Sequence, residues 1–186
     1  MMGRTLGSGS LNGGISGVAE ASADCCVIRL RRTAPGELAH EVRALGREVR
    51  RLLRPEGSAW LLVEDGRSGE SLAGRPWRVA FAPQHERWLL RNAVVVEPAS
   101  RTGETVLFCV KQARYFFGVE TVRVLPGSAR GDVVLPDEPG LADRVVLAAC
   151  PDGGIVLDLT DTTEFEIAAH RWGRKVIRIP SGLTAA

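Results

Sequence analysis

The hydrophobic and polar positions of the chain switch repeatedly between two periodicities. Short, nearly continuous apolar runs predict buried strands, whereas apolar residues three and four positions apart predict amphipathic helices. Strands are expected at residues 25–28, 58–63, 88–96, 105–110, 154–158 and 176–179. Helices are expected at about residues 35–53, 77–84, 141–150 and 164–172. Because the two kinds of element alternate along most of the chain, we predict a three-layer α/β sheet.

The helix expected at residues 35–53 has the clearest pattern. Pro35 suits the first helical turn, and Pro55 and Gly57 are expected to end the helix. One side is an apolar stripe made of Leu38, Val42, Leu45, Val49, Leu52 and Leu53. The other side is an arginine stripe made of Arg43, Arg47, Arg50, Arg51 and Arg54. Those arginines either contact phosphates or form a solvated face that nearby glutamates balance.

The remaining segments define the expected domain limits. Residues 1–20 are rich in Gly and Ser, so we expect a flexible arm that cannot bury enough apolar surface to fold. A single domain is expected at residues 21–182, with a Pro- and Gly-rich loop at residues 126–140. Trp60, Trp77 and Trp88 lie in or beside apolar runs and are expected in the core.

Composition narrows the class of protein. The chain is 45% hydrophobic with a net charge of +2, as is usual for a globular domain. It shows no apolar run long enough for a membrane helix and no secretory signal at its start, and its four cysteines form no CxxC pair. We therefore expect a cytoplasmic bacterial protein with no membrane contact and no metal site.

Four stretches, taken in order, carry a resemblance to a known family. They are residues 23–27, the EVRRLLRPEGS of residues 48–58, the PWRVAFA of residues 76–82 with the WLLR of residues 88–91, and residues 141–158. Together they resemble the bacterial DNA methyltransferases that modify adenine N6 or cytosine N4, in the permuted class whose catalytic half precedes the cofactor half. The resemblance implies a Rossmann-like mixed sheet with helices on both faces and S-adenosylmethionine as the cofactor.

The family's catalytic motif, (S/D)PP(Y/W), has no counterpart here. In the family, a Ser or Asp accepts hydrogen bonds from the target amino group, and an aromatic ring stacks on the flipped base. The aligned residues are Arg29, Leu30, Arg31 and Arg32. A guanidinium has only donors, so Arg29 cannot replace the acceptor. The three arginines are candidate nucleic-acid ligands at an anion site, the alternative being ordinary solvation of a loop.

The family's cofactor loop is also changed. The resemblance places a glycine-rich DPFxGSGTT loop after a strand, but the chain reads Asp158-Leu159-Thr160-Asp161-Thr162-Thr163-Glu164, without glycine. Asp158 is the one matched acid, and it either contacts the ligand or caps the next helix. Asp158 and Thr160 are the residues that we expect to contact S-adenosylmethionine if it binds.

These observations support two hypotheses about function. The first is a catalytically inactive methyltransferase-like protein that binds no cofactor and acts as a binding or regulatory partner of DNA or of an active methyltransferase. The second is an active but divergent DNA methyltransferase, for adenine N6 or cytosine N4, that uses S-adenosylmethionine. A decaying gene product without a role is a third interpretation. The sequence leaves open whether the protein is an enzyme.

Overall fold

A seven-stranded sheet forms the centre of the computed structural model, which describes residues 17–30, 35–96, 104–119, 133–134 and 140–179. The strand order is β7-β5-β6-β2-β1-β8-β9. The strands are β1 (Ala23–Leu30), β2 (Leu53–Glu64), β5 (Leu89–Val96), β6 (Glu104–Val110), β7 (Val133–Val134), β8 (Ile155–Leu159) and β9 (Lys175–Arg178). β1, β2, β8 and β9 run parallel to one another, and β6 pairs antiparallel with both β2 and β5. The predicted mixed sheet is confirmed.

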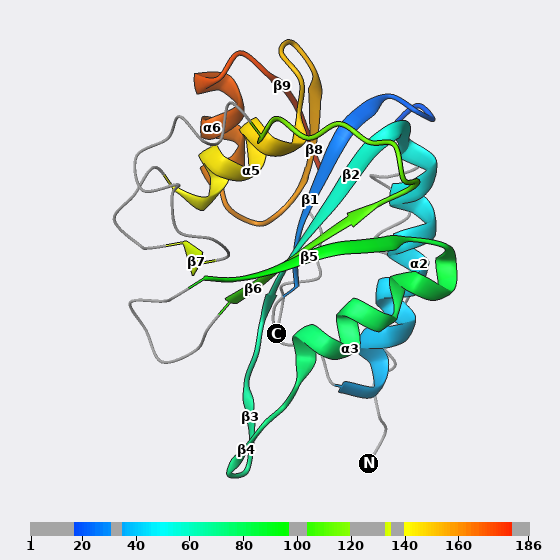
Figure 1. Cartoon of the computed structure of the whole chain (residues 1–186), viewed down its shortest axis with the longest axis vertical. Helices are drawn as coiled ribbons and strands as arrows, with labels where there is room; N and C mark the ends of the chain where they lie inside the picture. Colours follow the sequence, from blue (N-terminus) through cyan, green and yellow to red (C-terminus); the bar gives the residue numbers. More distant parts are fainter. Residues whose placement is uncertain (1–16, 31–34, 97–103, 120–132, 135–139, 180–186) are drawn as a thin grey trace.

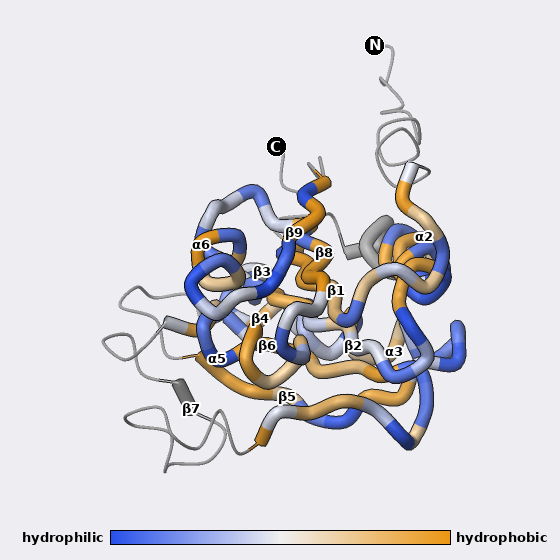
Figure 2. Tube along the Cα trace, turned by 90° about the horizontal axis from the view of Figure 1, so that it is seen from above, coloured by the Kyte–Doolittle hydropathy of each residue, from blue (hydrophilic) through white to orange (hydrophobic). Residues whose placement is uncertain are grey.

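Helices cover both faces of the sheet (Figure 1). On one face lie α2 (Pro35–Leu52), α3 (Arg75–Phe81) and the 3-10 helix η1 (Pro83–Glu86). On the other face lie α5 (Leu141–Ala149) and α6 (Glu164–Arg171). Figure 2 shows the largely apolar strands between these two helical layers. The buried apolar residues accordingly form two clusters, one on each side of the sheet.

The predicted helix of residues 35–53 is confirmed as α2, and its apolar stripe packs on the sheet through Val42, Leu45 and Val49. The residues expected to end the helix, Pro55 and Gly57, lie instead inside β2, which begins at Leu53. At Gly57 a side chain would lie 2.9 Å from the carbonyl oxygen of Asp24, which explains the glycine by close approach of β1 rather than by a helix cap.

Three other local predictions need correction. The helix expected at residues 77–84 is divided into α3 and η1, because Pro83 has no backbone N–H to continue the α-helical hydrogen bonding. A small hairpin of β3 (Arg67–Ser68) and β4 (Ser71–Leu72) was not predicted, and the two-residue β7 lies in the segment expected to be a loop. Trp60 and Trp88 are buried as expected, but Trp77 is 61% exposed, so its assignment to the core was wrong.

Two further features concern the limits of the domain. Most of the predicted arm of residues 1–20, and the end of the predicted domain after residue 179, lie outside the described residues. The domain limits given above therefore stay a prediction. Separately, none of the helices within the described segments is long and apolar enough to cross a membrane.

The topology brings the carboxyl ends of β1, β2, β8 and β9 to one edge of the sheet. In open α/β sheets, ligands bind at this edge. Arg29 is the next-to-last residue of β1, and Asp158 holds the same place in β8, the neighbouring strand. Since side chains alternate between faces along a strand, both share the face of their buried neighbours Val27 and Val156, which α5 and α6 cover.

Candidate functional site

Arg29 lies at the end of β1 with its guanidinium enclosed, only 7% exposed. Its Nε donates to Glu104 Oε1 at 3.1 Å, at the start of β6. Its Nη1 lies 2.5 Å from Glu164 Oε1, at the first residue of α6, and 3.4 Å from Thr162 Oγ1. One buried cation thus joins three elements that lie far apart in the sequence.

Two carboxylates balance this cation. Burial by itself lowers the pKa of Arg29, but the charges of Glu104 and Glu164 outweigh burial, so the pKa of Arg29 is raised. Burial raises the pKa of Glu104, and the neighbouring Arg29 offsets only part of that rise. Arg29 is therefore charged and matched inside the molecule, and an external anion would have to displace a carboxylate to reach it.

Asp158 is completely buried at the end of β8. Its Oδ1 accepts hydrogen bonds from the backbone N–H of Thr160 at 2.8 Å and from the Thr160 hydroxyl at 2.7 Å. Its Oδ2 has no hydrogen-bond partner among the described residues, and Arg178 Nε lies 3.7 Å from it. Burial raises the pKa of Asp158, and the Thr160 hydrogen bonds and Arg178 oppose the rise.

The loop between β8 and α6 is held by side chains of the loop, of α6 and of β9. Thr162 Oγ1 donates to Glu164 Oε1 at 3.0 Å, and Arg178 Nη2 donates to the carbonyl oxygen of Thr162 at 3.3 Å. The cap residue of α6 is Thr163, which makes no side-chain hydrogen bond to the helix. Of the two roles considered for Asp158, the helix cap is therefore wrong: Asp158 fixes the loop at Thr160 rather than the helix.

Sequence reasoning placed Arg29 and Asp158 at one edge, and the structure brings them to one face of neighbouring strands. The sequence pattern did not identify Glu104 as the partner of Arg29. The available signal was Arg29 itself, because an arginine in an otherwise apolar, buried strand needs a carboxylate. Leu30 is buried in the core cluster on the α2 side. Arg31 and Arg32 lie outside the described residues, so their assignment as nucleic-acid ligands stays a prediction.

The arginine stripe makes contacts within the molecule, and one of its members is corrected: Arg54, predicted on the helix, lies in β2, while the other four lie on α2. Arg47 pairs with Glu86 at 2.9 Å and Arg54 with Asp24 at 2.6 Å. Arg51 pairs with Glu48 at 3.2 Å, and Arg50 donates to backbone carbonyl oxygens beside the Trp88 ring. These contacts support the solvated-face interpretation, in which nearby acids balance the stripe.

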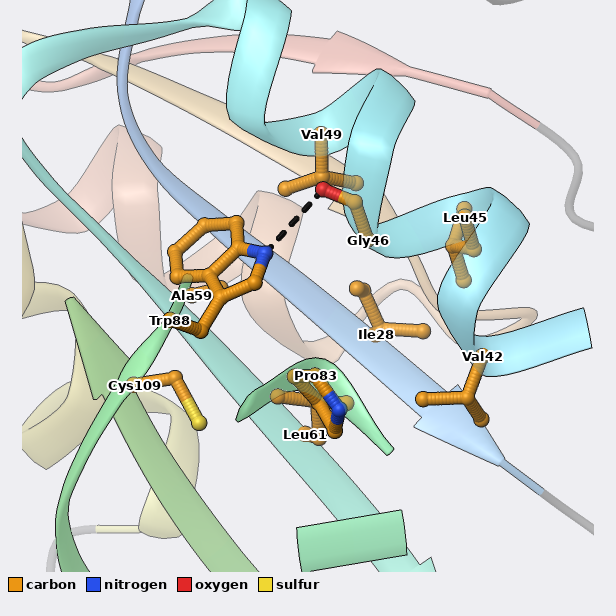
Figure 3. A pocket seen from close by; sticks show the side chains of 10 residues that line it. All are labelled: Ile28, Val42, Leu45, Gly46, Val49, Ala59, Leu61, Pro83, Trp88 and Cys109. Atoms are coloured by element: carbon orange, nitrogen blue, oxygen red, sulfur yellow. Dashed lines mark hydrogen bonds between the residues drawn. The ribbon is translucent and has the colours of Figure 1, made fainter. Parts of the chain in front are cut away.

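A small apolar cavity of about 10 Å³ lies on the α2 side of the sheet, away from Arg29 and Asp158. Figure 3 shows its lining, with Trp88 Nε1 donating across it to the carbonyl oxygen of Gly46 at 3.1 Å. A space of this size and polarity holds at most one poorly bound water. It is a packing defect and not a ligand site.

Gly46 offers a stability prediction at this cavity. Glycine inside a helix is unfavourable relative to alanine, and an added Cβ would lie 3.4 Å from Trp88 Nε1, an ordinary contact. We expect Gly46→Ala to raise the free energy of unfolding by about 0.5–1 kcal/mol, measured by urea denaturation. Gly57→Ala is the matched control and should destabilise, because its Cβ would collide with backbone oxygens. A loss of stability in Gly46→Ala would show that Trp88 cannot accommodate the methyl group.

No protein-family model matches the chain. Among curated proteins, it is 34% identical over 106 residues to the type II methyltransferase M.SfiI of Streptomyces fimbriatus, covering 42% of this chain. It is 25% identical over 136 residues to the type II methyltransferase M.XycI of Xanthomonas campestris pv. cyanopsidis, covering 52% of this chain. The chain spans only 25% of the length of the first and 45% of the second.

Solved structures extend the likeness over most of the chain. The PvuII cytosine-N4-specific DNA methyltransferase superposes with a TM-score of 0.76 at 13% identity, covering 88% of this chain and 77% of its own. A protein from Thermus thermophilus, described as a DNA modification methylase and complexed with S-adenosyl-L-methionine, superposes with a TM-score of 0.70 at 25% identity. That match covers 92% of this chain and 88% of the other. In sequence the chain is similar to parts of two type II methyltransferases, and in fold it is similar to solved DNA methyltransferases, with the Rossmann-like fold of S-adenosylmethionine-dependent methyltransferases.

Proposed function

We propose that the chain is a catalytically inactive methyltransferase-like protein that acts by binding DNA or an active methyltransferase. One observation carries the proposal: Arg29, at the position of the family's catalytic motif, is joined at 2.5 Å to Glu164, which lies in the segment aligned with the cofactor loop. The two altered motifs are thus bonded to each other. The ion pair gives both altered segments a structural role within the molecule.

The chemistry of methyl transfer supports the proposal. An amino group attacking a methyl sulfonium becomes cationic, so the enzyme must accept its hydrogen bonds and tolerate positive charge. Arg29 supplies only donors and a positive charge at this place. The following residue, Leu30, belongs to the apolar core and supplies no polar side chain.

The cofactor position supports it as well. Thr160 is buried and bonded to Asp158, and Thr162 is bonded to Glu164, so these polar groups of the loop are engaged with one another. No glycine lies in this loop to let a ligand approach the backbone. The residues present therefore do not fit S-adenosylmethionine in the manner that the family resemblance implies.

An active, divergent methyltransferase is the second candidate, favoured by Oδ2 of Asp158. This atom is buried without a hydrogen-bond partner among the described residues, and such atoms are often satisfied by a ligand. The structural neighbour from Thermus thermophilus, which is complexed with S-adenosyl-L-methionine, is consistent with it. In that case Asp158 and Thr160 would contact the cofactor.

Calorimetry and a methyl-transfer assay separate the two. We expect calorimetry to detect no S-adenosylmethionine binding with a dissociation constant below about 1 mM. That limit corresponds to a binding free energy of about −4 kcal/mol. We also expect no transfer of radiolabelled methyl groups to DNA above a protein-free blank, with an active relative as the positive control. Saturable binding with methyl transfer, both lost in Asp158→Ala, would establish the second candidate instead.

A further inference from the structure

Two large aromatic side chains are exposed on α3. Trp77 is 61% exposed and Phe81 is 60% exposed. They are four residues apart, so their side chains lie on the same side of the helix, one turn from each other. The opposite side of α3 is buried through Val79 and Ala80. We call Trp77, Phe81 and the intervening Arg78 the α3 face; it lies in the helical layer opposite the one that carries Glu164 (Figure 1).

Two exposed arginines of this region, Arg78 within α3 and Arg87 directly after η1, have no carboxylate within ion-pair distance among the described residues. The one acidic residue of α3 and η1, Glu86, is already paired with Arg47 at 2.9 Å. On α2, by contrast, Arg47 is neutralised by Glu86 and Arg51 by Glu48. Charge that is left without a partner on the surface favours an anionic ligand.

The chemistry of the α3 face suits bases and phosphates, because two exposed rings lie one turn apart with an exposed arginine between them. A stable protein interface buries about 800 Å² on each partner. Nucleobases need no such area, since each stacks on a single ring while the adjacent phosphate meets a cation.

We propose that the α3 face binds single-stranded nucleic acid. Unpaired bases stack on Trp77 and Phe81, and Arg78 and Arg87 contact the phosphates. Paired bases in a duplex are already stacked and cannot reach the rings. The proposal deepens the function proposed above, since it rests on a protein that binds a partner without methylating it, and it names the partner and the surface.

The test is fluorescence anisotropy of the full chain with a dye-labelled oligothymidylate of about 15 nucleotides, within the range of known single-strand sites. Because stacking contributes about 1–3 kcal/mol per base, Trp77→Ala and Phe81→Ala should each weaken binding by about 5- to 150-fold. Trp77→Phe should retain most of the affinity. Leu72→Ala, at a side chain 70% exposed on the neighbouring hairpin, is the matched control and should change nothing.

Salt and competition complete the test. Each neutralised phosphate contributes to the salt dependence of binding, so Arg78→Gln and Arg87→Gln should each flatten it. Unlabelled duplex DNA should compete poorly. No binding at low salt, or full binding by the Trp77→Ala/Phe81→Ala double variant, would overturn the proposal, and equal competition by polyglutamate would overturn it in favour of an acidic protein surface. Methyl transfer in the separate assay would contradict the proposed function and leave this binding result standing, so the two failures are distinguishable.

Discussion

Replacing Arg29 by methionine is expected to lower the free energy of unfolding by about 3–5 kcal/mol at neutral pH. Methionine fills similar space without charge, so the loss comes from the carboxylates that remain. Glu104 is the critical one, because its side chain is only 17% exposed, whereas Glu164 is 45% exposed and can be solvated. A buried carboxylate without its cation is among the most costly defects that one substitution can create.

The loss of stability in Arg29→Met should depend on pH, and the direction of that dependence follows from the pKa of Glu104. The pKa of Glu104 is raised by burial, although Arg29 lowers it in part. A carboxyl group with a raised pKa contributes stability that is present below its unfolded pKa and is lost as pH rises through the folded pKa. Without Arg29 the folded pKa rises further. The variant should therefore recover part of its stability as the pH is lowered from neutral into the mildly acidic range, relative to wild type, in urea denaturation at each pH.

Removing the orphaned acid is the control. Arg29→Met combined with Glu104→Gln should regain most of the lost stability, because neutral replacements of a buried ion pair are commonly tolerated. Glu164→Gln alone should cost less than about 1 kcal/mol, since its carboxylate is half exposed. A loss of stability in Arg29→Met that is the same at neutral and at mildly acidic pH, and that Glu104→Gln does not reduce, would contradict the proposed role of this ion pair.

The sequence predicted the helices that bury one face and the strands that are buried on both faces. The apolar stripe of α2 contains Val42, Leu45 and Val49, and each packs on the sheet. β1 is buried along its whole length, and an unbroken apolar run is the pattern of a strand covered on both faces. In such elements the hydrophobic effect acts on every position, so periodicity alone identifies them.

Elements that depend on few residues were not predictable in the same way. The β3–β4 hairpin has two residues in each strand, and Gly69, with its positive φ, is the only turn signal. Trp77 lies in an apolar-looking segment, yet it is exposed, as is Phe81 four residues along. Only the position of α3 relative to the sheet decides which side of so short a helix is buried.

The candidate site was predictable in place but not in chemistry. Spacing and resemblance put Arg29 and Asp158 at neighbouring strand ends, which the parallel pairing of β1 with β8 explains. The pairing of Arg29 with Glu104 depends on β6 lying two strands away, a contact between residues 75 positions apart. A single sequence carries no local signal for such a pair, whereas the Thr160 hydrogen bonds to Asp158 are local.

The position of Glu164 beside Arg29 depends on how firmly α6 is packed. The next residue, Phe165, has no exposed surface and belongs to the apolar cluster shared with α5 and the sheet. We expect Phe165→Ala to lower the free energy of unfolding by about 3–5 kcal/mol through lost burial and the cavity that is left. Urea denaturation measures the loss, and hydrogen exchange should show faster opening of α6.

Ile167 on the same helix provides the comparison. It is 53% exposed, so Ile167→Ala removes a side chain of large volume from the same element with little loss of buried surface, and should change stability by no more than about 0.5 kcal/mol. Equal losses in the two variants would contradict this role of Phe165, because alanine is the better helix former at both positions and only burial distinguishes them. If Phe165 does hold α6, weakening this helix also weakens the contact of Glu164 with Arg29. Phe165→Ala combined with Arg29→Met should then cost less than the sum of the single losses, because residues in one network are not additive.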